Sequence, residues 1–155
     1  MKPRIQNEIR RYDTISTDKY NSKIESNMFE NTINFNVYLK SIKKNIKVSL
    51  LCTWEYPFIP PDVYVNGHKY QRLLKQTTLN KKWIEKIHHK NYCMCCESIT
   101  CKNNWIPTLN FKNILDEIVD NVMFKTYVVS LFNANKIFQH CKINHDVLTE
   151  IIKFL

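Results

Sequence analysis

The chain has 155 residues, of which 44% are hydrophobic and only one is glycine, and its formal net charge is +9 at pH 7. This composition indicates a single folded domain over residues 1–155 and excludes a low-complexity chain. No stretch reaches the roughly 20 consecutive apolar residues of a membrane-spanning helix, and no signal-peptide pattern opens the chain. We therefore expect no membrane partner and a cytoplasmic or nuclear protein that is not secreted, whose six cysteines stay reduced.

The first residues have the pattern of a short basic helix. Ile5, Ile9 and Tyr12 recur at helical spacing, so they are expected to face the protein interior. The basic residues left for the solvent side include Arg4, Arg10 and Arg11.

Two runs of alternating residues follow and predict adjacent antiparallel strands. Residues 33–39 and 46–54 each place an apolar residue at every second position, and a polar, lysine-rich turn at 41–45 separates them. Three prolines within residues 56–61 then prevent a regular helix or a central strand. A third strand is expected at 62–65, ending at the turn signal Asn66-Gly67.

The second half of the chain is predicted to be mainly helical. Residues 68–92 are expected to form an irregular crossover with one short helix capped by Asn80. After Pro107, a strong helical pattern with Asn110 as N-cap predicts a helix that covers the sheet, and further helices are expected at 128–140 and 144–155. The predicted fold class is α+β, with an antiparallel meander, an N-terminal helix and C-terminal helices packed on it.

This order of elements resembles the ubiquitin-conjugating enzyme family. The third strand of that family is introduced by a Tyr-Pro-Phe-x-Pro-Pro segment, which residues 56–61 match. Its active cysteine lies shortly before a Trp-x-Pro element, which is similar to Trp105-Ile106-Pro107 here. The resemblance covers roughly residues 3–122, while the crossover at 68–92 and the helical part at 123–155 diverge from the family.

The resemblance implies that a cysteine thiolate accepts ubiquitin, or a ubiquitin-like modifier, as a thioester from an activating enzyme and passes it to a lysine. A thiol suits this role because its thiolate is both nucleophilic and a good leaving group. The register Cys96-x-Ser98-Ile99 matches the family, so Cys96 is the expected nucleophile and Cys95 the second choice. The resemblance also implies that the basic helix meets the activating enzyme through Arg4, Arg10 and Arg11, with a ligase as a further partner.

One family element departs from the pattern. The family carries a His-Pro-Asn element upstream of its cysteine, and the nearest approximation here is His89-Lys90-Asn91, directly before the cysteine cluster. Asn91 is the candidate for positioning the loop and steadying the developing oxyanion. The departure favours an alternative, a catalytically inactive module of the same fold that binds ubiquitin or a partner protein.

The cysteine cluster has a second interpretation as a metal site. Thiolates are ligands of structural zinc, but the spacing of these cysteines lacks the paired Cys-x-x-Cys elements that are typical of such sites. The enzyme hypothesis itself expects no cofactor. The alternative zinc ligands are Cys93, Cys95, Cys96 and Cys101. Cys52 and Cys141 lie within apolar patterns and are predicted to be packing residues. A nucleic-acid partner rests on charge alone and is not expected, since aromatic residues do not interleave with a basic patch.

Overall fold

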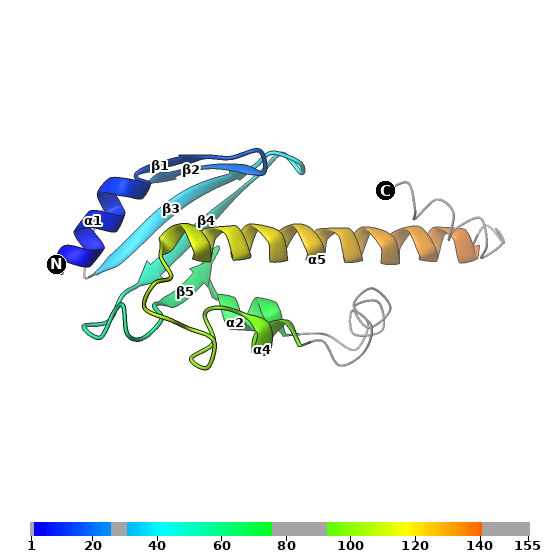
Figure 1. Cartoon of the computed structure of the whole chain (residues 1–155). Helices are drawn as coiled ribbons and strands as arrows, with labels where there is room; N and C mark the ends of the chain where they lie inside the picture. The colour runs from blue at the N-terminus through cyan, green and yellow to red at the C-terminus, as the bar shows by residue number, and fades with distance from the viewer. Residues whose placement is uncertain (1, 26–30, 76–92, 141–155) are drawn as a thin grey trace.

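A computed structural model describes residues 2–25, 31–75 and 93–140 of the chain. These residues form an α+β fold in which an N-terminal helix, a six-stranded antiparallel sheet and a long C-terminal helix follow one another (Figure 1). The strands lie in the sheet in their chain order, so the predicted meander is confirmed. The elements are α1 (Pro3–Tyr12), β1 (Thr14–Ser16), β2 (Tyr20–Ile24), β3 (Thr32–Leu39), β4 (Lys44–Leu51), β5 (Asp62–Val65), β6 (His68–Lys69), α2 (Tyr70–Leu74), α4 (Met94–Glu97) and α5 (Phe111–His140).

Strands β1 and β2 were not predicted from the sequence. Tyr20, Ser22 and Ile24 alternate towards the interior, but the serine in the middle of this run hides the apolar alternation. The Ser22 hydroxyl is buried and has no hydrogen-bond partner within the described structure. Burial in this strand is therefore imposed by pairing with β3, where Ser22 lies opposite Val37.

Strands β3 to β5 confirm the alternation read from the sequence, with one correction at the end of β4. The strand ends at Leu51 rather than continuing to residue 54. Cys52 is still buried, but Trp54 is 77% exposed and belongs to the turn that leads to residues 56–61. At the other end of β5, Asn66 and Gly67 both have positive φ, as expected for a two-residue hairpin turn into β6.

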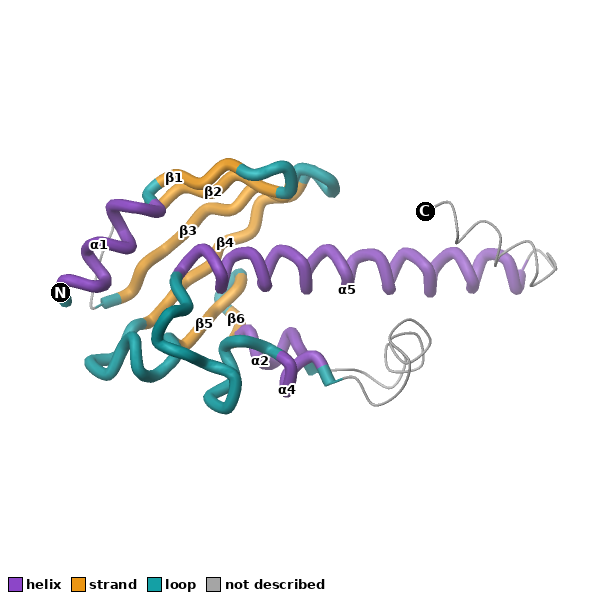
Figure 2. The backbone as a smooth tube through the Cα atoms, in the orientation of Figure 1, coloured by secondary structure: helices purple, strands orange, loops and turns teal. Residues whose placement is uncertain are grey.

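The predicted crossover begins with regular structure, not an irregular segment. The chain enters β6 and then α2, whose Tyr70 and Leu74 are buried. The expected helix after Asn80 lies outside the described residues. Figure 2 shows α2 and α4 lying next to each other below the sheet, and the two helices pack together.

Helix α5 is continuous where two separate helices were expected. Its 30 residues contain neither glycine nor proline, so nothing in the backbone interrupts it. At about 1.5 Å per residue, the helix is roughly 45 Å long. The longest strands of the sheet, β3 and β4, have only eight residues each, so the helix extends beyond the sheet (Figure 1). The expected helix at 144–155 and Cys141 lie outside the described residues.

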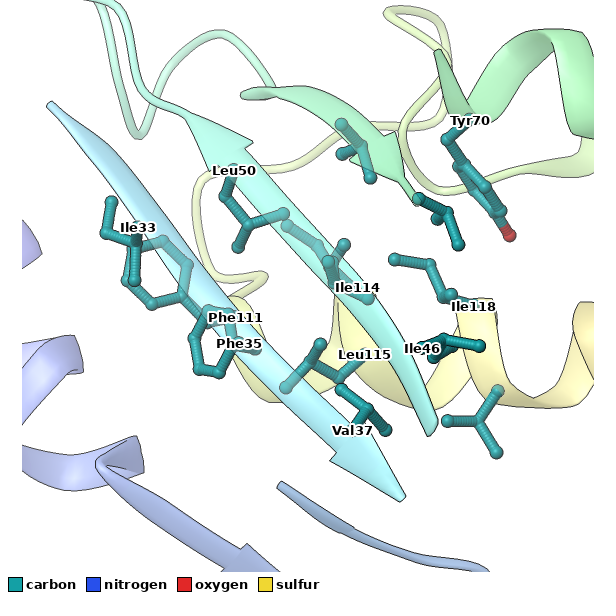
Figure 3. Close-up of a cluster of buried hydrophobic side chains, with 14 of the residues drawn as sticks. Ile33, Phe35, Val37, Ile46, Leu50, Tyr70, Phe111, Ile114, Leu115 and Ile118 are labelled. Carbon is teal, nitrogen blue, oxygen red and sulfur yellow. The ribbon is translucent and has the colours of Figure 1, made fainter. Parts of the chain in front are cut away.

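The core lies between the sheet and the first half of α5. Phe111, Ile114, Leu115 and Ile118 point from the helix onto the sheet (Figure 3). They meet Ile33, Phe35, Val37, Ile46 and Leu50 of β3 and β4, and all of these side chains are buried. The helix starts where predicted: the Asn110 side chain accepts a hydrogen bond from the Asn113 amide at 3.2 Å, and the Asn113 side chain accepts one from the Asn110 amide at 3.1 Å. Within the described ranges, no helix has the length and apolar character needed to cross a membrane.

Candidate functional site

Three thiols lie together at the start of α4. The Sγ atoms of Cys93 and Cys95 are 2.9 Å apart, those of Cys95 and Cys96 are 4.0 Å apart, and all three lie within 4.8 Å of one another. Met94, between the first two cysteines, is buried in the core and fixes the helix against the protein. Cys101, the fourth zinc candidate from the sequence, does not join this group.

The three thiols differ in exposure and in acidity. Cys96 is exposed, whereas Cys93 and Cys95 are half-buried. Hydrogen bonds from the Cys95 thiol and from the backbone amide of Cys96 lower the pKa of Cys93 to about 7. Hydrogen bonds to Cys93 and Cys95, together with repulsion from their negative charge, raise the pKa of Cys96 to about 11. The first thiolate of the cluster therefore forms at Cys93, beside the exposed thiol.

The segment after the cluster is fixed by side chains that the sequence analysis did not single out. The Asn104 side-chain amide donates to the carbonyl oxygens of Cys96 at 2.6 Å and Ser98 at 3.0 Å. Glu117 of α5 accepts hydrogen bonds from the Ser98 hydroxyl and the Ile99 amide, each at 2.6 Å. Asn104 thus supports the loop that carries Cys96, a role expected for Asn91, which lies outside the described residues.

Glu117 has a further donor in Tyr70, whose hydroxyl lies 3.0 Å away. This carboxylate therefore joins α5, α2 and the segment after Cys96. The only sequence signal for it is an acidic residue next to the apolar face formed by Ile114 and Ile118.

The proline segment at 56–61 and the segment that begins at Trp105 are in direct contact. The indole N–H of Trp105 donates to the carbonyl oxygen of Pro57 at 2.7 Å, and the Trp105 and Tyr56 ring centroids are 6.1 Å apart. The Tyr56-Pro57 peptide bond is cis. Trp105 follows the cysteine loop directly and is buried, so the loop ends at a fixed point.

A buried carboxylate joins these segments to the first helix. Glu8 is only 4% exposed and accepts hydrogen bonds from the Tyr56 hydroxyl at 2.7 Å and from the Phe111 amide at 2.8 Å. It also forms an ion pair with Arg4. The sequence pattern favoured Ile9 for the buried face of α1, but Ile9 is only partly buried and Glu8 takes the interior position.

The three arginines of α1 are not equivalent. Besides its contact with Glu8, Arg4 donates to the Leu109 carbonyl oxygen at 3.3 Å, so much of its hydrogen-bonding capacity is used within the protein. Arg10 and Arg11 are exposed, and the Arg11 guanidinium lies over the Tyr12 ring. Arg4 and Arg11 line one hollow of about 220 Å³ that also includes Thr108.

Large apolar side chains are exposed around the Trp105–Pro57 contact. Trp54 and Phe58, which flank the start of the proline segment, are each 77% exposed, and Ile106 is 55% exposed. Removing such side chains from water costs little free energy, and exposed apolar side chains are typical of protein-binding surfaces.

Comparisons with models of known protein families, with curated protein sequences and with solved structures returned no match.

Proposed function

We propose that this chain is a ubiquitin-conjugating-enzyme-like protein that accepts ubiquitin or a ubiquitin-like modifier on Cys96 and transfers it to a lysine. The observation that carries the proposal is an exposed thiol on an anchored loop that ends at the Trp105–Pro57 contact. A modifier of protein size reaches only a thiol at the surface, and Cys96 is the exposed one of the three.

The proposed reaction has two steps. The sulfur of Cys96 attacks the thioester that joins the modifier to the activating enzyme, and the cysteine of that enzyme leaves as a thiolate. The amine of a substrate lysine then attacks the new thioester, a C–N bond forms, the C–S bond to Cys96 breaks and the amine loses a proton. Cys96 must lose its own proton before the first step.

Among the described residues, Cys93 is the base that we assign to receive that proton. Its thiolate is the first to form in the cluster, and its sulfur lies within 4.8 Å of the Cys96 sulfur. Transfer of the proton from Cys96 to Cys93, directly or through Cys95, puts the thiolate on the exposed sulfur. The transfer is uphill, because the pKa of Cys96 is higher than that of Cys93, so only a small fraction of the protein carries the reactive thiolate at neutral pH.

The exposed apolar side chains supply a docking surface for a protein partner such as a ligase. Phe58 and Ile106 extend from the two segments that the Trp105–Pro57 hydrogen bond joins. The exposed Arg10 and Arg11 supply a separate basic surface on α1 for an activating enzyme.

A second candidate is a module of the same fold that binds the modifier or a partner protein without catalysis. The raised pKa of Cys96 favours it, because a thiol with a pKa of about 11 is almost fully protonated at neutral pH. The apolar and basic surfaces serve binding whether or not the thiol reacts.

A thioester assay distinguishes the two candidates. The protein is mixed with activating enzyme, ATP and ubiquitin, and the products are separated on non-reducing and reducing gels. The expected result is a thiol-sensitive adduct in the wild type that disappears with Cys96→Ala and persists with Cys101→Ala, the control outside the cluster. Cys96→Ser is expected to give an adduct that resists thiols, because the ester then has oxygen in place of sulfur.

Two results would change the assignment. An adduct lost with Cys93→Ala and retained with Cys96→Ala would move the nucleophile to Cys93. The absence of an adduct from folded protein, with several ubiquitin-like modifiers, would leave the binding module as the function.

A further inference from the structure

We propose that Cys93, Cys95 and Cys96 bind one Zn²⁺ ion with a fourth position open, and that the bound metal keeps Cys96 from accepting a modifier. The second clause rests on the function proposed above, whereas the metal site stands on the geometry of the three sulfurs.

The spacing of the sulfurs suits a single ion. In a tetrahedral zinc site with Zn–S distances of about 2.3 Å, neighbouring sulfurs lie about 3.8 Å apart. The distances found here, 2.9 Å from Cys93 to Cys95 and 4.0 Å from Cys95 to Cys96, lie on either side of this value. To bind one ion the three separations must become about equal, and rotation about the Cα–Cβ bonds of the cysteines is the motion that would adjust them.

Among the residues that the structure describes, the donor set leaves one coordination position for another ligand. Cys101, which the sequence offered as a fourth ligand, lies outside the group of three. Zinc bound by three protein ligands completes its tetrahedron with water or an external ligand, as in open zinc sites. The exposure of Cys96 gives that ligand access from solvent.

The loop is held independently of any metal. Asn104 fixes the carbonyl oxygens of Cys96 and Ser98, and Met94 anchors α4 in the core. Because the three cysteines are arranged before the ion arrives, binding does not require folding of this segment. The ion would replace the protons of the neutral thiols, which pass to solvent.

The consequence for the proposed reaction is direct. A sulfur that is bonded to zinc has an engaged electron pair and is a weaker nucleophile than a free thiolate. Removal of the metal by a chelator frees Cys96, so metal supply would control how much of the protein can accept the modifier.

The metal site is tested with Co²⁺ as a spectroscopic substitute for Zn²⁺. The full chain is stripped of metal under reducing conditions and titrated with Co²⁺, then with Zn²⁺. We expect a sulfur-to-cobalt charge-transfer band and the visible bands of tetrahedral cobalt, saturating at one equivalent and removed by one equivalent of Zn²⁺. Neither signal depends on activity.

Matched variants locate the ligands. Cys93→Ser and Cys96→Ser are expected to weaken binding by more than the roughly 10- to 100-fold that loss of an outer-shell partner costs. Cys101→Ser is expected to bind as the wild type does. A missing charge-transfer band in the wild type, or equal loss with Cys101→Ser, would overturn the site.

The proposed masking, in which bound zinc keeps Cys96 from accepting a modifier, is tested in the thioester assay. The assay is run with and without one equivalent of Zn²⁺, and a zinc-selective chelator is then added. Loss of the adduct on Zn²⁺ addition and its return with chelator are expected, while the thioester of the activating enzyme itself, seen in the same lanes, stays constant. Charging that persists with a full equivalent of zinc bound would overturn the masking. A cobalt band in a protein that is never charged would uphold the metal site and remove the proposed function, and the masking with it.

Discussion

The indole N–H of Trp105 donates a 2.7 Å hydrogen bond to the carbonyl oxygen of Pro57, 48 positions earlier in the chain. This bond fixes the end of the cysteine loop against the proline segment, and both partners belong to segments on which the family resemblance depends. Trp105 is buried, so the carbonyl oxygen of Pro57 loses its donor if the indole is removed.

Replacing Trp105 by phenylalanine removes the donor to the half-buried Pro57 carbonyl and part of a buried side chain, and it is expected to lower the free energy of unfolding by about 1–3 kcal/mol. Urea denaturation followed by circular dichroism measures this change. Trp54→Phe is the matched control, because Trp54 is 77% exposed, and a change within about 0.5 kcal/mol is expected. Equal effects of the two substitutions would show that the hydrogen bond contributes nothing.

Glu8 is expected to be the most sensitive polar position of α1. Its carboxylate accepts hydrogen bonds from Tyr56 and from the first amide of α5, so Glu8→Gln replaces one acceptor by a donor and is expected to cost about 1.5–3 kcal/mol. Glu8→Ala is expected to cost more, because two donors then lose their partner. Asp18→Asn, on the surface between β1 and β2, is the control and should change stability by less than about 0.5 kcal/mol. Wild-type stability of Glu8→Gln in urea would contradict the role of the carboxylate.

The segment after Cys96 is expected to loosen when Glu117 loses its charge. In the wild type, the Ser98 hydroxyl and the Ile99 amide donate to different oxygens of the Glu117 carboxylate. In Glu117→Gln, the side-chain amide has only one oxygen for these two donors. Hydrogen exchange at the Ile99 amide is expected to accelerate about 10-fold or more, the equivalent of about 1.4 kcal/mol. Asp120→Asn, one turn further along α5 and exposed, is the control, since its pair with Lys19 is a surface ion pair. If Ile99 exchanges at the same rate in both variants, Glu117 does not hold the segment.

Cys52 is expected to make stability depend on pH in the alkaline range. Burial, with a smaller contribution from the charge of Glu8, raises the pKa of Cys52 from 9.0 to about 12. Because the folded state resists ionisation, this thiol contributes its full stability below about pH 9 and loses it as the pH rises towards about 12. The stability difference between wild type and Cys52→Ala should therefore shrink by at most about 1.4 kcal/mol per pH unit in that window. A difference that stays constant from neutral pH to pH 11 would argue against the shift.

Several features of the fold were readable from local pattern. The alternation in residues 33–39 and the turn at Asn66-Gly67 depend on side-chain period and backbone conformation, which neighbouring residues decide. The start of α5 at Asn110 likewise follows from a capping side chain and the apolar spacing after it. Strands β1 and β2 were not predictable in this way, because a buried serine interrupts their apolar pattern. The two helices expected on either side of residue 123 form the single helix α5.

The cysteine site follows partly from the sequence and partly from the folded structure. Three of the four candidate ligands are close in sequence, so one turn of helix brings Cys93, Cys95 and Cys96 together. The different acidities of Cys93 and Cys96 depend on hydrogen bonds that no spacing predicts. The separation of Cys101 from the group is likewise visible only in the folded chain. The raised pKa of Cys96 in particular arises from where its two neighbours point.

The sequence by itself determined the α+β fold class, the positions of three of the six described strands (β3, β4 and β5) and the identity of the clustered thiols, because these follow from side-chain period, turn chemistry and proximity along the chain. Only the tertiary structure decided that Glu8, Asn104 and Glu117 hold the proline segment, the cysteine loop and α5 together. These contacts join residues from different elements, and a buried carboxylate or amide is stable only where the folded chain brings its donors or acceptors to it.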